Sequence, residues 1–167
     1  MSNKFEFILE NNNYSKLIFK FDYKNTHVHS FNEELPKDWK EVYKVYYSWK
    51  IYRKYEYDDE KYTQTLLNLS CDECSIIPDL STIIKRVIET GEVFNYPTLG
   101  QPAGDWIINK KTYKDFDNTE KSYIEFQVFN NVSGQGIRWS MNIDNSLNFC
   151  NYLDSINDYA LKHGEPI

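Results

Sequence analysis

Alternation of apolar and polar positions dominates the first part of the chain and predicts β-structure there. Residues 4–10 and 15–23 are rich in β-branched and aromatic side chains, and three consecutive asparagines lie between them. Asparagine tolerates the left-handed conformations that tight turns require. We therefore expect the two segments to form an opening hairpin.

The segment 43–57 is compatible with two secondary structures. Apolar residues recur at every second position up to Ile51, which is the period of a strand. A helical spacing also fits four residues that begin before the segment: Trp39, Val42, Tyr46 and Trp49. Because the run is dense in Tyr, Trp, Val and Ile, its helix propensity is low. We predict a short helical turn over 36–42, a long strand over 43–57, and a returning strand over 61–70.

Helical periodicity occurs twice. The first set of apolar residues predicts a helix over roughly 79–90 and comprises Leu80, Ile83, Ile84, Val87 and Ile88. Asp79 or Ser81 would cap its start, and Gly91 follows its end. The second set predicts a helix over 145–163, with Asp144 as its cap, and comprises Phe149, Leu153, Ile156 and Ala160.

The region between the two helices contains a loop and three strands. Residues 95–105 hold two prolines and two glycines without periodicity, which indicates an irregular loop. Strands are predicted over 106–113, 123–130 and 136–142, in a meander. The order of elements predicts one α+β domain over 1–167. Its antiparallel sheet would have about seven strands, in hairpins and a meander, covered on one face by two helices.

Size and charge narrow the classes of function. The chain has 167 residues and a net charge of −6, which opposes contact with nucleic acid or an anionic membrane and favours a protein partner with a basic surface. The sequence starts without the basic and apolar regions of a secretory signal, and no apolar run approaches the roughly 20 residues that span a bilayer. We therefore expect a cytoplasmic protein without a membrane association.

Two cysteines and two histidines form the only candidate metal ligands of interest. Cys71 and Cys74 have the Cys-x-x-Cys spacing of half a zinc site, and His27 and His29 are alternate residues of an extended segment. No second cysteine pair accompanies them, and acidic residues between the cysteines disfavour a reactive thiol. We expect the cysteines to lie reduced in a loop, the histidines to face solvent, and no metal or cofactor to be bound.

The sequence carries no catalytic signature. Neither a Gly-x-Ser-x-Gly nucleophile motif nor a glycine-rich phosphate-binding pattern is present. The glycines of residues 133–136 lie between two predicted strands, where a hairpin turn explains them. No pair of carboxylates is marked by its context as an acid and base couple.

The most distinctive stretch is residues 40–62, which hold half of the 14 tyrosines together with several lysines. Such interleaving resembles platforms for single-stranded nucleic acid, but acidic residues in the same stretch neutralise it. In a strand, the even positions would face outward, and tyrosine is enriched at protein interfaces. The predicted partner-binding residues are Tyr46, Lys50, Tyr52, Lys54, Glu56, Asp58, Asp59 and Glu60.

These observations favour a small acidic non-enzymatic protein that binds or inhibits another protein. An immunity protein, or a phage anti-defence protein of the anti-CRISPR type, has this general character. Two alternatives stay open. One is an enzyme or sensor that holds a metal between the histidine pair and the cysteine pair, and the other is a structural subunit that self-associates through the hairpin around 43–57. The sequence leaves the oligomeric state open.

Overall fold

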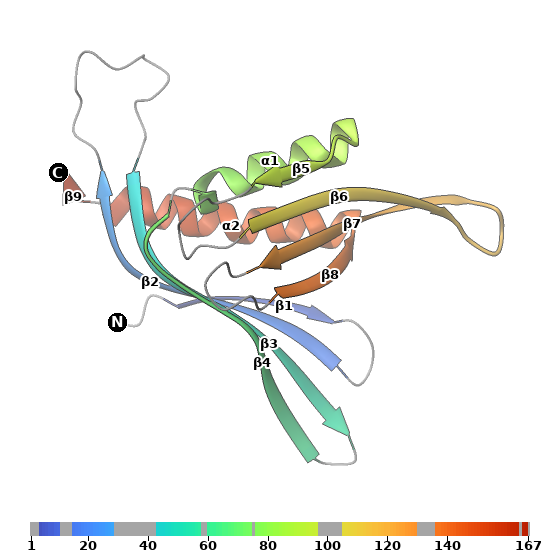
Figure 1. The fold of residues 1–167 in the computed structure, drawn as a ribbon, viewed down its shortest axis with the longest axis horizontal. Coiled ribbons are helices and arrows are strands. Elements are labelled where there is room, and N and C mark those ends of the chain that lie inside the picture. The colour runs from blue at the N-terminus through green and yellow to red at the C-terminus, as the bar shows by residue number, and fades with distance from the viewer. Residues whose placement is uncertain are drawn as a thin grey trace.

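Two β-sheets and two helices make up the described part of the chain (Figure 1). The computed structural model describes residues 4–10, 15–28, 43–57, 60–74, 76–96, 105–129, 136–163 and 165–166. The first sheet has the strand order β1 (Lys4–Glu10), β2 (Ser15–Val28), β3 (Tyr43–Tyr57) and β4 (Glu60–Cys74), all antiparallel. A two-residue strand, β9 (Glu165–Pro166), pairs in parallel with the end of β2.

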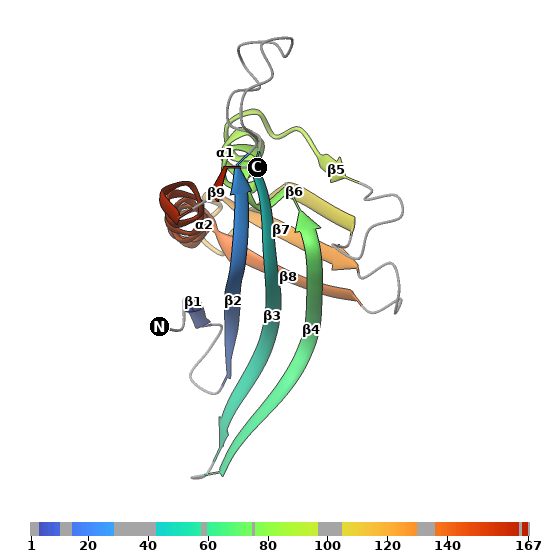
Figure 2. The same ribbon diagram turned by 90° about the vertical axis from the view of Figure 1, so that its left-hand side faces the viewer.

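The second sheet is an antiparallel meander that follows helix α1 (Ile76–Thr90). Its strands in order are β5 (Phe94–Tyr96), β6 (Asp105–Lys114), β7 (Glu120–Phe129) and β8 (Gly136–Asn142). Helix α2 (Ile143–His163) comes next and packs against α1 and against strands of both sheets. In Figure 2 the strands of the second sheet cross those of the first.

The predicted α+β class is confirmed, but its strands form two sheets and not one. Helix α1 carries the chain away from β4, so the strands after it pair with one another and not with the first sheet. β5 was not predicted, because its three residues next to a proline-rich segment are too few to display a period. The strands β1, β3 and β8 have the predicted bounds.

The competition between strand and helix over 43–57 is resolved in favour of the strand. β3 pairs with β2 over residues 43–55 on one side and with β4 over residues 45–57 on the other. The predicted turn over 36–42 lies outside the described residues. β4 continues to Cys74, so the prediction that Cys71 and Cys74 lie in a loop is wrong, since their backbones pair with β3.

Helix α1 begins earlier than predicted, at Ile76. Pro78 therefore lies in the first turn, where a missing N–H costs no helical hydrogen bond. Neither Asp79 nor Ser81 is the N-cap, because both lie inside the helix. The predicted end is confirmed: Gly91 has a φ of 72°, and its N–H donates to the carbonyl of Val87 at 2.9 Å.

Helix α2 is capped by Asn142 and not by Asp144. The side-chain oxygen of Asn142 accepts a hydrogen bond from the backbone N–H of Asn145 at 2.7 Å, the geometry of an N-cap and its N3 residue. Asp144 lies in the first turn, where its charge complements the helix dipole.

We expect Asn142→Ala to lower the free energy of unfolding by about 1 kcal/mol, because it removes this cap. Chemical denaturation followed by circular dichroism measures the change. Asp144→Ala is the matched control and should cost less, since it removes only a partner of the helix dipole. An equal or larger loss for Asp144→Ala would contradict the assignment of the cap.

The core lies where the two sheets and α2 meet. Phe19 of β2, Trp139 of β8 and Phe149 of α2 are all buried, and the centroid of the Phe19 ring lies 5.2 Å from that of each partner. Phe126 of β7 stacks on Trp139, with ring planes 7° apart and centroids at 5.1 Å. This aromatic cluster holds the first sheet, the second sheet and α2 together.

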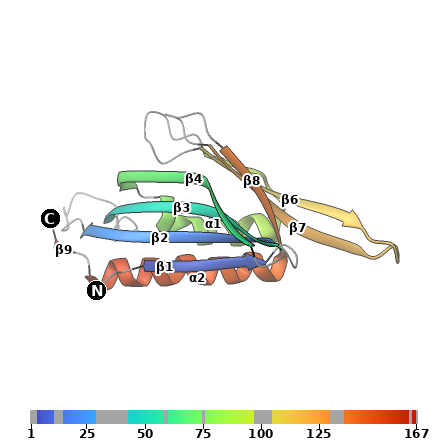
Figure 3. The same ribbon diagram turned by 90° about the horizontal axis from the view of Figure 1, so that it is seen from below.

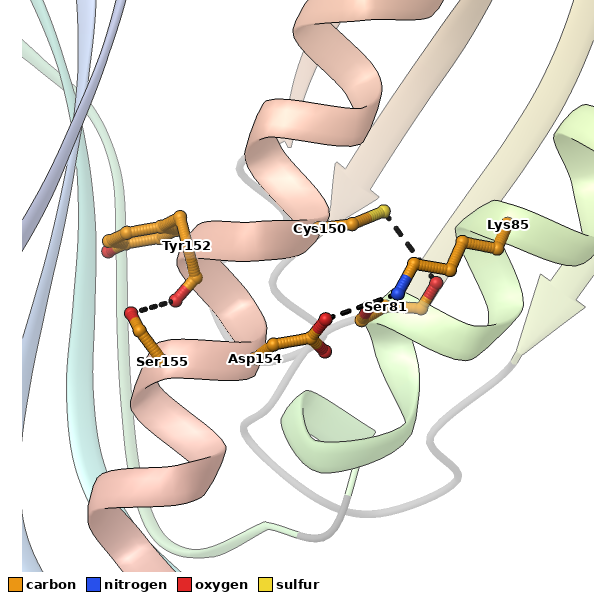
Figure 4. A network of polar contacts seen from close by, with 6 residues as sticks. All are labelled: Ser81, Lys85, Cys150, Tyr152, Asp154 and Ser155. Atoms are coloured by element: carbon orange, nitrogen blue, oxygen red, sulfur yellow. Dashed lines mark hydrogen bonds and ion pairs between the residues drawn. The ribbon is translucent and has the colours of Figure 1, made fainter.

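A small polar network joins the two helices (Figure 4). The ammonium of Lys85 lies 3.1 Å from the carboxylate of Asp154, and the thiol of Cys150 donates to the carbonyl of Ser81 at 3.7 Å. Burial raises the pKa of the Cys150 thiol, so the group stays protonated at neutral pH. The thiol is therefore a packing group of the interface between α1 and α2.

Candidate partner-binding surface

The outer face of the first sheet lies on the side opposite the helices, and Figure 3 looks onto it. We call this surface the open face. Its described members alternate along the strands with residues that point into the core. They are Glu6, Ile8 and Glu10 of β1, Lys16, Ile18 and Lys20 of β2, Lys50, Tyr52, Lys54 and Glu56 of β3, and Lys61, Thr63 and Thr65 of β4.

The alternation of buried and outward-facing residues along each strand assigns these residues to the open face. On β2 the odd positions Leu17, Phe19 and Phe21 are buried, so the even positions between them belong to the other face. On β3 Ile51 is fully buried, which assigns Lys50 and Tyr52 to the open face. The same alternation was the basis for the predicted outward face of 43–57, and it is confirmed at these positions.

An apolar row crosses the middle of the open face. Ile8 lies opposite Ile18, and Ile18 lies opposite Tyr52, so three neighbouring strands each contribute one residue. Ile8 is 47% exposed, a large value for an isoleucine on a sheet. Such a row offers a partner an apolar contact whose position on the sheet is fixed by the strand register.

Ion pairs border the apolar row on both sides. The ammonium of Lys20 lies 3.4 Å from the carboxylate of Glu6, and that of Lys16 lies 3.2 Å from that of Glu10. Both pairs link β1 to β2 across the ladder. Because all four side chains are well exposed, the pairs contribute little to stability, and they give the row a polar rim.

Lysine side chains also surround Tyr52. The Lys20 ammonium lies 5.7 Å from the centroid of the Tyr52 ring, within the range of a cation–π interaction. Lys54 lies 3.8 Å from Glu56. Lys50 is half-buried and has no ion-pair partner among the described residues. Among the described lysines of the open face, Lys50 and Lys61 thus have no ion-pair partner and can each meet an anionic group.

The structure places half of the predicted partner-binding residues together on this surface. Lys50, Tyr52 and Lys54 are half-buried and Glu56 is exposed, all on one face of β3. Tyr46 and Glu60 belong to β3 and β4 by their backbones, and their side chains are not described. Asp58 and Asp59 lie outside the described residues.

Sequence reasoning missed the contribution of β1 and β2. Ile8 and Ile18 are the two apolar residues that complete the row, and the neighbouring charged residues form its rim. A signal was present: both isoleucines occupy the polar phase of strands whose other phase is already apolar. An apolar residue at a position that should be polar indicates either an interface or a second packing layer.

The hypothetical ligand set of two histidines and two cysteines is only partly described. By backbone register, His27 pairs with Lys44 of β3, and Cys74 pairs with Val45 of the same strand. β3 therefore separates the two backbones, which places them about 9.5 Å apart. His29 lies outside the described residues. Within the described ranges no group of three or more His, Cys, Asp or Glu residues could hold a metal ion. The alternative of a metal held between the histidine pair and the cysteine pair stays a hypothesis, as does the expectation that no metal is bound.

The described helices include none that is long and apolar enough to cross a membrane.

Comparisons with known proteins assign the chain to no family. No family model matches it, and no curated protein is significantly similar to it. A solved structure of the plant transcriptional regulator PBF-2 is 10% identical over 94% of this chain and 90% of that chain, with a TM-score of 0.38. A likeness at this level carries no argument about fold or function, so any function has to be inferred from the chain's own surfaces.

Proposed function

We propose that this protein is a non-enzymatic binding protein that holds a protein partner on the open face of its first sheet. One observation carries the proposal: an apolar row of Ile8, Ile18 and Tyr52 crosses three strands between exposed ion pairs. An apolar centre with a polar rim is the usual arrangement of a protein interface.

The shape of the side chains also supports binding at this row. Tyr52 is held against the Lys20 ammonium, so less conformational entropy is lost when a partner covers the ring. The strand ladder fixes the spacing of the three apolar residues before any partner arrives. A preorganised surface of this kind binds more tightly than a flexible one of equal area.

The charge of this protein indicates the charge of its partner, first at long range and then at the contact itself. The net charge of −6 favours approach by a protein whose overall surface is basic. At the contact itself the described members of the open face include five lysines against three glutamates, and Lys50 has no described ion-pair partner. We therefore propose a basic partner that places at least one carboxylate beside Lys50.

A small acidic protein that covers a basic partner acts as an inhibitor when the covered surface is functional. Immunity proteins and phage anti-defence proteins, including those of the anti-CRISPR type, work in this general way, and we extend that role to this chain as part of the proposal. It rests on acidity, on size and on the lack of a catalytic signature in the sequence.

Affinity capture with matched variants tests the proposal. Wild type, Tyr52→Ala and Leu147→Ala would be immobilised in parallel and exposed to an extract of the native host. We expect a stoichiometric basic protein to be retained by wild type and by Leu147→Ala, whose exposed side chain lies on α2. Tyr52→Ala should bind the purified partner roughly 30-fold more weakly, the effect of removing an interface anchor.

Charge reversal provides an independent check of the same surface. Lys50→Glu should weaken binding of the purified partner, because it places a second carboxylate beside the partner's carboxylate, and the difference from wild type should shrink as salt is added. All variants should keep melting temperatures close to that of wild type, since these side chains contribute little to the core. If the partner binds Tyr52→Ala and Lys50→Glu as tightly as wild type, the open face is not the binding site.

A further inference from the structure

The hairpin of β6 and β7 extends beyond the rest of the second sheet and ends in an ordered turn (Figure 1). One carboxylate oxygen of Asp115 accepts hydrogen bonds from the backbone N–H groups of Asp117, at 3.0 Å, and Thr119, at 2.9 Å. The other oxygen lies 2.9 Å from the ammonium of Lys121. Asn118 takes the positive φ of 61° that the turn requires.

The same interactions hold the turn ordered over a wide range of pH. The hydrogen bond with Lys121 and the backbone hydrogen bonds lower the pKa of Asp115 below its usual value. The carboxylate therefore stays ionised, and the turn keeps its acceptor, to a lower pH than an ordinary aspartate would allow.

This ordered turn presents a phenylalanine to solvent. Phe116 has a relative exposed area of 110%, so its ring contacts nothing else in the described chain. Tyr113 and Tyr123 lie just behind it, with ring centroids 5.9 Å apart. A single exposed apolar residue is common on proteins, but a fully exposed ring on a rigid projecting turn has the form of an interface anchor.

A pocket of matching size lies elsewhere on the same molecule. It has a volume of about 150 Å³ and lies between the second half of α1 and the start of β5. Its lining is Ile83, Arg86, Val87, Glu92, Val93 and Phe94. Apolar cavities of about 150 Å³ accept a benzene ring. The pocket is thus large enough for a phenyl group.

The pocket carries a cation, Arg86, beside an anion, Glu92, and the turn carries a carboxylate. Arg86 lies at the pocket, where its guanidinium is 3.1 Å from the carboxylate of Glu92, and both side chains are exposed. Asp117 follows Phe116 in the turn and has no ion-pair partner among the described residues. A ring entering the pocket would bring the Asp117 carboxylate towards Arg86.

The turn cannot reach the pocket of its own molecule. Phe94 at the pocket pairs with Ile108, and β6 runs on from there as far as Lys114. The turn therefore lies about 20 Å away along the strand. We propose that Phe116 of one molecule inserts into the pocket between α1 and β5 of a second copy of this chain, which makes a head-to-tail contact.

This contact is independent of the open face, because it uses only α1 and the second sheet. A head-to-tail contact joins two different surfaces, so it builds rings or open chains of molecules and not a closed symmetric dimer. With one anchor and a small contact area, we expect a weak association with a Kd of about 0.1–1 mM.

Sedimentation velocity over concentrations from about 20 µM to 1 mM, chosen to span that affinity range, measures the association. Wild type should form larger species as its concentration rises. Phe116→Ala removes the anchor, and Val93→Asp places a carboxylate at the pocket that disfavours an apolar ring and repels Asp117, so each should weaken association at least about 30-fold. Both sites are exposed, and unchanged melting temperatures would confirm that the variants fold.

Mixing the two variants separates this contact from any other kind of self-association. Phe116→Ala still has an intact pocket, and Val93→Asp still has an intact anchor, so the mixture should form one-to-one dimers and nothing larger. Leu147→Ala should associate like wild type. The proposal is overturned if wild type stays monomeric at the highest concentration, if Phe116→Ala associates like wild type, or if the mixture forms no dimer.

Discussion

Replacing Trp139 with alanine is expected to lower the free energy of unfolding by about 3–5 kcal/mol, the range for a large buried aromatic residue. The ring is almost completely buried and contacts aromatic residues of both sheets, Phe19 of β2 and Phe126 of β7. Its loss would open a cavity where the sheets meet. Urea denaturation, followed by far-ultraviolet circular dichroism, measures the change.

Trp139→Phe is the matched control. The indole N–H of Trp139 is buried without a described hydrogen-bond partner, so phenylalanine removes an unsatisfied donor while it keeps a ring next to Phe126. We expect a clearly smaller loss than for Trp139→Ala. Equal stability of Trp139→Ala and wild type would mean that the two sheets do not share this core.

Two adjacent residues of β2 should respond to the same truncation with losses of very different size. Phe19→Ala is expected to cost about 3–5 kcal/mol, because its ring is fully buried against Trp139 and Phe149. Ile18→Ala should cost less than about 1 kcal/mol, since Ile18 lies on the open face. Parallel denaturation curves of the two variants make the comparison.

The contact between the sheets can also be measured as a coupling. With ring centroids 5.2 Å apart, Phe19→Ala and Trp139→Ala should not be additive, and their interaction energy should be about 0.5–3 kcal/mol. Strict additivity of the two losses, or a large loss for Ile18→Ala, would contradict the described arrangement of β2.

The sequence predicted local structure well where a periodic pattern of apolar residues continued over many positions. The strand over 43–57 was predicted because alternation continued through Ile51, and β3 has those bounds. The end of α1 was predicted because Gly91 suits the left-handed conformation after a helix. Such signals depend only on neighbouring residues, so one sequence is enough to detect them.

Pairing between distant segments was not predictable in this way. Alternation shows that β6 has one apolar face, but it does not show which sheet contains β6, and one sheet was predicted where two are present. Cys71 and Cys74 were placed in a loop because nothing in their own segment indicated a metal or redox site or a continued strand, whereas β3 provides the hydrogen bonds that extend β4. Tertiary partners outweighed local propensity at both places.

The same distinction applies to the candidate site. The even positions of β3 could be predicted from its own period, and Lys50 and Tyr52 lie on the open face as expected. Ile8 and Ile18 belong to the same row only because the register of β1, β2 and β3 aligns them. The sequence of any one strand therefore reveals only part of a surface that three strands build together.

The packing of α2 on β1 determines when the fold can be completed during synthesis. The Tyr152 hydroxyl donates to the carbonyl of Phe5 at 3.3 Å, and the rings of Phe7 and Phe149 lie 5.2 Å apart. At ribosomal speeds of 5–20 residues per second, the apolar side of the first hairpin waits about 7–30 s for these partners. The nascent chain therefore presents an unburied aromatic surface to chaperones throughout most of its translation.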